Sequence, residues 1–384
     1  MNRAVRCIVV TVIVLLLHLL LGVRLFWRPA PAAEPVMAPG QPGAENAVSA
    51  VEEAPGGAPE AVPSSPAAAA EAGGAAGTAA DRTPAATAAG RPGPQVPARS
   101  AFPVYSRGFY RYAPLPMPDK LQRMVASCRA GVVIDVEQRT VLWQKNATQN
   151  YPIASLTKLL TAQLLIEKVA ADPAVNMQSV LKVTAADSKY LRSRRITGVY
   201  LDSRDHLTFS EYVKCMIIAS ANDCAVIAGK YIGGGDIEAG VVELNRRARE
   251  LGLTGMHLYN ANGLPIDRGG ERIENTGSAL EVAYLAERSL GFPEIMKWAK
   301  VAGDCIREDT KRFDLHSTNK LLRARVPGVN GLKTGYTATA GYCIAVTCQR
   351  GNRTVIVVVM GVPGNDYGRH RDAIAKALLD WVYG

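Results

Sequence analysis

A serine and a lysine stand three residues apart at the head of an apolar segment. Ser155 and Lys158 begin a stretch whose leucines predict a helix that extends to about Ala170. Residues i and i+3 lie on one face of a helix, so the Lys158 amine can reach the Ser155 hydroxyl. A lysine can take the proton of a serine when burial or a second cation lowers the lysine pKa. The pair therefore predicts a nucleophilic serine at residue 155.

The same spacing occurs again at Ser317 and Lys320, so this short motif alone does not identify a nucleophile. The first copy differs because two further polar motifs follow it, Ser220-x-Asn222 and the Lys-Thr-Gly of residues 333–335. Ser220 and Asn222 fall where one predicted helix gives way to the next, and buried hydroxyl and amide groups there need partners. A simple helix cap is the alternative interpretation, because asparagine caps helices well.

The apolar pattern predicts an α+β fold with αβα layers. A hairpin is expected at residues 131–144, and three further strands are expected at 329–337, 341–347 and 354–360. Helices are predicted between these two groups of strands and at the end of the chain, near residues 208–218, 223–232, 237–251, 279–288 and 372–381. We therefore expect a five-stranded antiparallel sheet flanked by helices, with a helical block inserted between its strands.

The first 104 residues differ in composition from the rest. An apolar run, Cys7–Val23, follows two arginines and is long enough to span a bilayer. Residues 1–29 are therefore predicted to be a transmembrane anchor, with a cleaved signal peptide as the alternative. Residues 30–104 are rich in alanine, proline and glycine, a composition typical of a disordered tether. Residues 105–384 are left as one folded domain.

The formal net charge is +10, which could indicate a nucleic-acid partner. The basic residues are scattered and no nucleic-acid motif accompanies them, so an anionic wall polymer or membrane surface fits an exported protein better. No residue spacing predicts a metal site, and no cofactor is expected. An even number of domain cysteines leaves disulfides open, but free buried thiols are preferred for Cys128, Cys215, Cys224, Cys305, Cys343 and Cys348.

The three motifs, in this order on one exported domain, resemble the motif set of penicillin-binding proteins and serine β-lactamases. Within that superfamily the chain resembles the low-molecular-mass penicillin-binding proteins, which are serine-type D-alanyl-D-alanine carboxypeptidases of peptidase family S11. The resemblance covers about residues 125–384. It rests on the motifs and their surroundings, in particular residues 154–158, 316–319, 331–337 and 340–343.

The resemblance implies a catalytic role for three residues. Ser155 would attack the bond between the last two D-alanines of a peptidoglycan stem peptide and form an acyl-enzyme. Lys158 would accept its proton, and Ser220 would pass a proton to the departing amine. The oxyanion would be held by the backbone N–H groups of Ser155 and Tyr336. β-Lactam antibiotics would acylate Ser155 as covalent inhibitors.

The resemblance also implies a set of substrate-binding residues. Asn222 would bind the peptide backbone of the substrate, and Lys333 would add positive potential. Thr334 would hydrogen-bond the terminal carboxylate at the edge of the strand that holds Gly335 and Tyr336. An arginine usually completes carboxylate binding, since its fork of donors suits a carboxylate. Arg371 is predicted for this role, and Arg369 is the alternative.

Three alternatives stay open beside the carboxypeptidase. The first is a D,D-endopeptidase that cleaves peptidoglycan cross-links. The second is a serine β-lactamase, which is disfavoured because no deacylation carboxylate is visible; Glu243 lies in a helical pattern. The third is a non-catalytic wall-binding protein.

The resemblance places the protein in the periplasm or on the outer face of the cytoplasmic membrane. The chain ends soon after the predicted closing helix, so the C-terminal β-domain and membrane helix of many relatives are expected to be absent. Anchoring to the membrane is then expected from the N-terminal segment.

Overall fold

The computed structural model describes residues 110–384. The predicted anchor at 1–29 and the predicted tether at 30–104 lie outside the described residues. The helices are α2 (Asp119–Ala126), η1 (Ala154–Thr157), α3 (Lys158–Ala171), α4 (Ala185–Ser193), α5 (Phe209–Ile218), α6 (Asn222–Ile232), α7 (Ile237–Glu250), α8 (Ala279–Leu290), α9 (Pro293–Ala299), α10 (Lys320–Arg323) and α11 (Arg369–Tyr383). The strands are β1 (Arg111–Tyr112), β2 (Ala130–Asp135), β3 (Thr140–Lys145), β4 (Asn150–Pro152), β5 (Ile266–Arg268), β6 (Glu271–Ile273), β7 (Thr276–Ser278), β8 (Gly303–Ile306), β9 (Phe313–His316), β10 (Val329–Thr337), β11 (Gly341–Arg350) and β12 (Arg353–Val362).

The central sheet has six strands, in the order β1-β3-β2-β12-β11-β10. The five predicted strands are present and pair antiparallel. The prediction of five strands was wrong by one, because β1 adds a parallel edge beside β3. β1 is two exposed residues held by backbone hydrogen bonds, such as Arg111 N–H to the Arg139 carbonyl at 2.9 Å. It therefore leaves no apolar alternation for the sequence to reveal.

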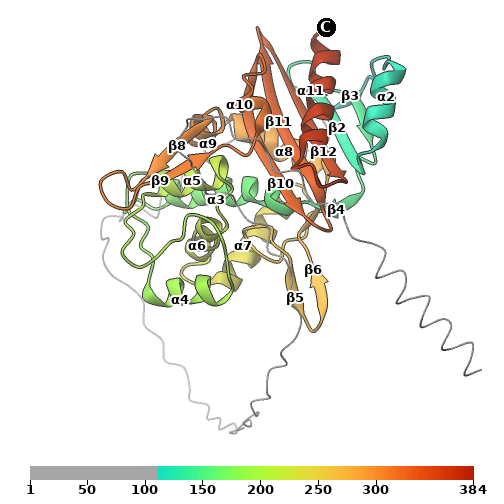
Figure 1. Cartoon of the computed structure of the whole chain (residues 1–384). Coiled ribbons are helices and arrows are strands. Elements are labelled where there is room, and N and C mark those ends of the chain that lie inside the picture. The colour runs from blue at the N-terminus through green and yellow to red at the C-terminus, as the bar shows by residue number, and fades with distance from the viewer. Residues whose placement is uncertain (1–109) are drawn as a thin grey trace, which may run out of the picture. The chain divides into compact units, whose positions relative to one another are not determined.

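Both faces of the sheet are buried, which gives the predicted αβα layers (Figure 1). On β12, Val355, Val357 and Val359 belong to the core shared with α2 and α11. The alternate residues Ile356, Val358 and Met360 belong to the core shared with α8 and the helical block. Successive side chains of a strand point to opposite faces, so one apolar run fills two cores.

The helical block between β3 and β10 positions the candidate motifs. The capping box predicted at the start of α5 is confirmed: the Thr208 hydroxyl accepts from the Glu211 N–H, and the Glu211 carboxylate accepts from the Thr208 N–H. The chain then turns at Ser220, whose φ is +60°, and α6 begins at Asn222. The polar stretch before Asp205, for which the sequence predicts no element, contains α4.

All six described cysteines are buried free thiols, as the sequence favours. The Cys215 and Cys224 thiols nevertheless hydrogen-bond each other, because the turn at Ser220 folds α6 back along α5. Burial raises the pKa of Cys224 well above its usual value, and contact with Cys215 adds to this.

Across residues 110–384, no helix is both long enough and apolar enough to cross a bilayer.

Candidate active site

The candidate nucleophile lies on a tight turn. Ser155 is part of η1, a single 3-10 turn from which α3 continues. Ala154, just before it, has a φ of +46°. The edge strand β10 packs against η1. Ser155 therefore lies between the edge of the sheet and the helical block.

Two glycines allow other segments to approach this turn closely. A Cβ at Gly335, in the Lys-Thr-Gly motif, would lie 3.1 Å from the Ser155 amide nitrogen. A Cβ at Gly263 would lie only 2.0 Å from the Ala154 carbonyl oxygen, and Gly263 also has a φ of +83°. The segment before β5 thus packs against the nucleophile turn through backbone contact.

Replacing Gly263 with alanine is expected to lower the free energy of unfolding by about 2 kcal/mol or more, because the Cβ meets backbone atoms in a strained conformation. The reactivity of the Ser155 hydroxyl should fall as well, since the clash falls on the nucleophile turn. Gly270→Ala is the matched control: its φ is also +83°, but nothing lies within 4 Å of the new Cβ. Equal losses in urea unfolding for both variants would contradict the close-approach explanation.

Lys158 is held at the centre of the site by three partners. Its Nζ lies 2.8 Å from Ser155 Oγ, 2.8 Å from Asn222 Oδ1 and 2.5 Å from the Asn262 carbonyl oxygen. A neutral amine has two N–H donors and one lone pair. Donation to Asn222 and Asn262 leaves that lone pair facing the Ser155 hydroxyl. The arrangement can therefore take a proton from Ser155.

The surroundings of Lys158 favour the neutral amine. The side chain is fully buried, and burial lowers its pKa well below the usual value. The nearby charge of Lys333 lowers the pKa further, while Asp223 and Cys224 act in the opposite direction. The sequence analysis expected burial or a second cation to lower the pKa of this lysine, and both causes are present.

Lys333 forms a second lysine–serine pair with Ser220. Its Nζ donates to Ser220 Oγ at 2.8 Å and to the Thr334 carbonyl at 2.8 Å. Lys333 is also buried, and burial together with the charge of Arg371 lowers its pKa to about 7. The site thus holds two buried lysines, each bonded to a different serine, and the two serines come from separate motifs.

The lowered pKa of Lys333 predicts a pH dependence of stability. Between about pH 7 and 10.5 the unfolded chain holds the Lys333 proton more tightly than the folded chain. The free energy of unfolding should therefore rise with pH, by at most about 1.4 kcal/mol per pH unit for one group. Lys333→Met should lose the contribution of this group, so its stability should rise less steeply with pH than that of the wild type. Urea unfolding at pH 7 and pH 9 measures it, and parallel pH profiles of the two proteins would contradict the prediction.

Thr334 makes a contact that sequence reasoning missed. Its hydroxyl donates to the Thr318 hydroxyl at 2.7 Å. Thr318 is held against the end of α5, because its N–H donates to the Ile218 carbonyl at 3.1 Å. The only sequence signal was the likeness of residues 316–319 to the same segment of relatives. Two hydroxyl groups therefore lie side by side at the edge of β10.

Arg371, the residue predicted to complete carboxylate binding, is buried in α11. It is 4% exposed and donates to Asp372 Oδ1 from both Nε (3.0 Å) and Nη2 (2.6 Å). Its Nη1 donates to the Cys343 carbonyl at 3.3 Å. Arg369 is exposed at the start of α11. Arg371 therefore contacts β11 from α11 with most of its donors occupied, and its charge acts on Lys333.

Tyr336 stands at the rim of this group. Its side chain is 49% exposed and stacks on Tyr342 of the neighbouring strand, with ring centroids 4.3 Å apart. The structure thus brings one end of β10 together with the turns at Ser155 and Ser220. Arg371 differs from the other predicted site residues, because its guanidinium is already hydrogen-bonded to the Asp372 carboxylate.

The sequence profile of the D-alanyl-D-alanine carboxypeptidases, peptidase S11, matches residues 119–364. The chain belongs to this family. D-alanyl-D-alanine carboxypeptidase DacF of Bacillus subtilis is 30% identical over 265 residues, which cover 69% of this chain and 64% of that protein. DacC of Escherichia coli is 28% identical over 262 residues, which cover 66% and 61%. The match therefore spans less than two thirds of the length of these two relatives.

Other similar proteins are covered more completely. A D-alanyl-D-alanine endopeptidase of Pseudomonas aeruginosa is 26% identical over 268 residues, which cover 68% of this chain and 79% of that protein. The fold is similar to that of the Streptomyces K15 DD-transpeptidase, with a TM-score of 0.58 at 20% identity over 67% of this chain and 97% of that chain. Penicillin binding protein 5 from Haemophilus influenzae gives a TM-score of 0.58 at 23% identity, over 67% and 71%.

The second Ser-x-x-Lys copy of this S11 protein does not form a comparable pair. Lys320 Nζ donates to the Tyr367 carbonyl at 2.7 Å, and the Ser317 hydroxyl accepts from the Asn319 N–H at 3.3 Å. Equal spacing therefore gives two different environments. Glu243 lies in α7, as the helical pattern predicts, and forms ion pairs with Arg246 and Lys168.

Asn262 and its neighbours are the other residues that sequence reasoning missed. The Ala261 carbonyl accepts from the Thr161 hydroxyl at 2.7 Å, and Asn275 Nδ2 donates to the Thr157 hydroxyl at 3.0 Å. These bonds fix the turn before β5 against the first turns of α3. Lys158 is bound there by a backbone carbonyl, which any residue type supplies, so the sequence carries no direct signal for it.

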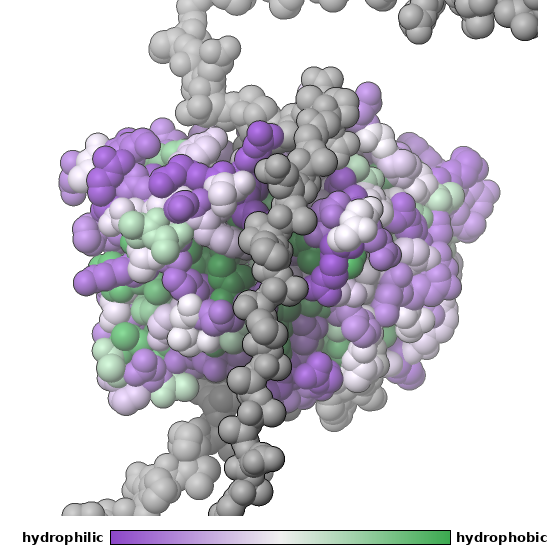
Figure 2. Space-filling view, turned by 90° about the horizontal axis from the view of Figure 1, so that it is seen from below, coloured by the Kyte–Doolittle hydropathy of each residue, from purple (hydrophilic) through white to green (hydrophobic). Residues whose placement is uncertain are grey.

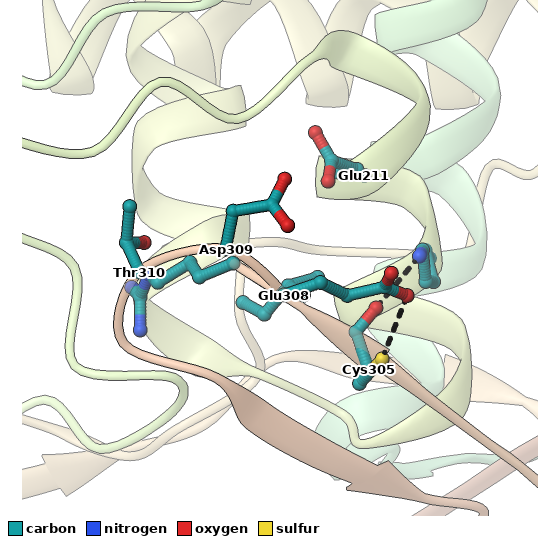
Figure 3. Close-up of a pocket in the computed structure, with 8 residues that line it drawn as sticks. Glu211, Cys305, Glu308, Asp309 and Thr310 are labelled. Carbon is teal, nitrogen blue, oxygen red and sulfur yellow. Dashed lines mark hydrogen bonds between the residues drawn. The ribbon is translucent and has the colours of Figure 1, made fainter.

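A separate pocket lies between α5 and the β8–β9 hairpin (Figure 3). Cys305 Sγ donates to Glu308 Oε1 at 3.0 Å, and Lys214 Nζ donates to the Cys305 carbonyl at 2.8 Å. None of the residues that line it belongs to the three motifs. Within residues 110–384, no group of three or more histidine, cysteine or acidic side chains is arranged to hold a metal ion.

Proposed function

We propose that this S11 protein is a serine-type D-alanyl-D-alanine carboxypeptidase that removes the terminal D-alanine from peptidoglycan stem peptides. The observation that carries the proposal is the 2.8 Å approach of the buried Lys158 amine to the Ser155 hydroxyl. The pKa of that amine is lowered, so it can act as a base at neutral pH. The substrate class, peptides that end in D-alanyl-D-alanine, is inferred from membership of the S11 family.

The proposed reaction begins when Ser155 Oγ attacks the carbonyl of the penultimate D-alanine and its proton moves to Lys158 Nζ. The backbone N–H groups of Ser155 and Tyr336 would stabilise the oxyanion. The C–N bond then breaks, and the departing D-alanine amine takes a proton from Ser220, which Lys333 hydrogen-bonds at 2.8 Å. Ser220 is reprotonated by the proton that Lys158 received. Water finally attacks the ester while Lys158 takes its proton, and Ser155 recovers this proton as the shortened peptide leaves.

Substrate binding is proposed to divide between the two sides of Ser155. Asn222 would hold the backbone of the acyl part, while Lys333, Thr334 and the neighbouring Thr318 would face the terminal carboxylate. Asp372 already accepts from two nitrogens of Arg371. Arg371 would therefore favour the carboxylate through its positive charge rather than through a free donor fork.

The test uses the full-length protein and the stem pentapeptide that ends in D-alanyl-D-alanine. Release of free D-alanine, together with covalent labelling by a fluorescent penicillin, is the expected result. Labelling without release of D-alanine would contradict the carboxypeptidase proposal. The absence of both would favour the non-catalytic wall-binding alternative, and rapid hydrolysis of the penicillin would favour a β-lactamase.

A D,D-endopeptidase is the second candidate. The observation that favours it is the larger share of the endopeptidase relatives that this chain covers, 79% for the Pseudomonas aeruginosa protein against 64% for DacF. The same Ser155 chemistry would then act on a D-alanyl bond within a cross-link. A cross-linked muropeptide dimer offered beside the pentapeptide distinguishes the two. A higher kcat/KM for the dimer would favour the endopeptidase.

The N-terminal residues are proposed to hold the enzyme at the outer face of the cytoplasmic membrane. Residues 1–29 would anchor the chain or direct its export, and residues 30–104 would be a tether to the domain at 105–384. Support comes from the apolar run of residues 7–23 and the alanine- and proline-rich composition that follows. Release of the expressed full-length protein from membranes by alkaline carbonate would contradict an uncleaved anchor.

A further inference from the structure

Four basic side chains cluster at the end of α4 and in the loop that follows. We name Lys189, Arg192, Arg194 and Arg195 the basic arm; all four are exposed. Within the part of the chain that the structure describes, none of them forms an ion pair, whereas the exposed Arg204 nearby is paired with Asp202. The arm therefore presents positive charge that no described carboxylate neutralises.

The acidic residues of the neighbouring segments are already paired. Asp187, within α4, forms an ion pair with Lys230 at 2.6 Å, and Asp205 forms one with Arg307 at 2.6 Å. The lower face of the molecule, which carries α4 in Figure 1, is mostly hydrophilic where it is uncovered (Figure 2). The charge of the arm is thus available to an external anion.

The loop that carries the arm is fixed beside the candidate active site. The Asn222 N–H donates to the Thr197 carbonyl at 3.2 Å, so the loop reaches the Ser-x-Asn motif. The Asp223 carboxylate accepts from the N–H groups of Val199 (3.2 Å) and Leu201 (3.1 Å). A Cβ at Gly198 would lie 1.8 Å from Asp223 Oδ1. The loop therefore packs closely on the first turn of α6.

The end of α4 is equally well fixed. The N–H groups of Arg194 and Ile196 donate to the carbonyls of Tyr190 (3.1 Å) and Leu191 (2.9 Å). Two residues separate Arg194 from Thr197, so about 11 Å of fully extended chain is the farthest that their Cα atoms can lie apart. An arginine side chain adds several ångströms of reach. The Cα atoms of Arg194 and Arg195 therefore lie within about 11 Å of that of Thr197, whose carbonyl accepts from the Asn222 N–H.

We propose that the basic arm, through Arg194 and Arg195, binds a carboxylate in the upstream part of the peptidoglycan stem peptide. This inference rests on the proposed function, in which Asn222 holds the acyl part of the substrate and the leaving D-alanine lies toward Ser220 and Lys333. The stem peptide carries such a group as the free α-carboxylate of its γ-linked glutamate, two residues before the scissile alanine. A guanidinium suits a carboxylate because it can donate two parallel N–H bonds.

The test compares two stem pentapeptides with the full-length protein, one with this α-carboxylate free and one with it converted to a carboxamide. At low ionic strength the wild type should favour the free carboxylate by about 5- to 10-fold in kcat/KM, mainly through KM, as expected for exposed charge pairs. The preference should shrink as salt is added. The double variant Arg194→Gln/Arg195→Gln should lose the preference while it processes the carboxamide peptide like the wild type.

A matched control removes two exposed positive charges elsewhere, through Arg249→Gln/Lys300→Gln, and should keep the preference. No preference in the wild type, or a preference that survives in the arm variant, would overturn the inference while leaving the carboxypeptidase proposal intact. An equal loss on both peptides would also overturn it, because the arm would then act without regard to the carboxylate. Release of D-alanine from neither peptide by the wild type would overturn the function and the inference together.

Discussion

Replacing Ser155 with alanine is expected to reduce D-alanine release by about 10⁴-fold or more, because loss of the nucleophile leaves only binding and oxyanion stabilisation. The fold should survive the change. Ser155 gives up one hydroxyl, and Lys158 keeps Asn222 Oδ1 and the Asn262 carbonyl as partners. Kcat on the pentapeptide and the melting temperature measure the two effects separately.

The second serine of the same spacing provides the control. Covalent penicillin should label Ser317→Ala but not Ser155→Ala, since Lys320 is engaged with the Tyr367 carbonyl and leaves Ser317 without a base. Peptide mapping of the labelled wild type should place the adduct on Ser155. Label that persists in Ser155→Ala would show that another residue is the nucleophile.

Replacing Lys158 with methionine is expected to lower kcat/KM by about 10³-fold, within the range for the loss of a general base. Methionine has a similar length but cannot take a proton. The acyl-enzyme should form slowly with penicillin as well, because acylation needs the same proton transfer. In the wild type the acylation rate should rise with pH as Lys158 becomes neutral, in keeping with its lowered pKa.

The effect of Lys158→Met on stability should be small in comparison. The variant leaves Asn222 Oδ1 and the Asn262 carbonyl without a donor, at a cost of about 1–3 kcal/mol for each buried group. It also removes the cost of burying an amine, which acts in the opposite direction. Lys320→Met, at the equivalent position of the second copy, should leave the acylation rate within about twofold of the wild type, as is usual for surface changes. A similar loss in both variants would contradict the assigned base.

The sequence by itself determined the parts that depend on local pattern. Short runs of apolar and β-branched residues indicated β2, β3 and β10–β12, and the Thr208 capping box marked the start of α5. The order of three short motifs distinguished Ser155 from Ser317, although both have the same spacing to a lysine. These features are visible in sequence because side-chain periodicity and capping act within a few residues.

The tertiary structure alone decided which groups meet across long separations. It bound the Lys158 amine to the backbone carbonyl of Asn262, set the Thr318 hydroxyl beside Thr334, and placed the Arg371 guanidinium against the Cys343 carbonyl of β11. It also added β1, which pairs with β3 through backbone hydrogen bonds. A backbone group has no residue-type signature, and burial depends on packing between distant segments. These contacts therefore could not be derived from the order of the residues.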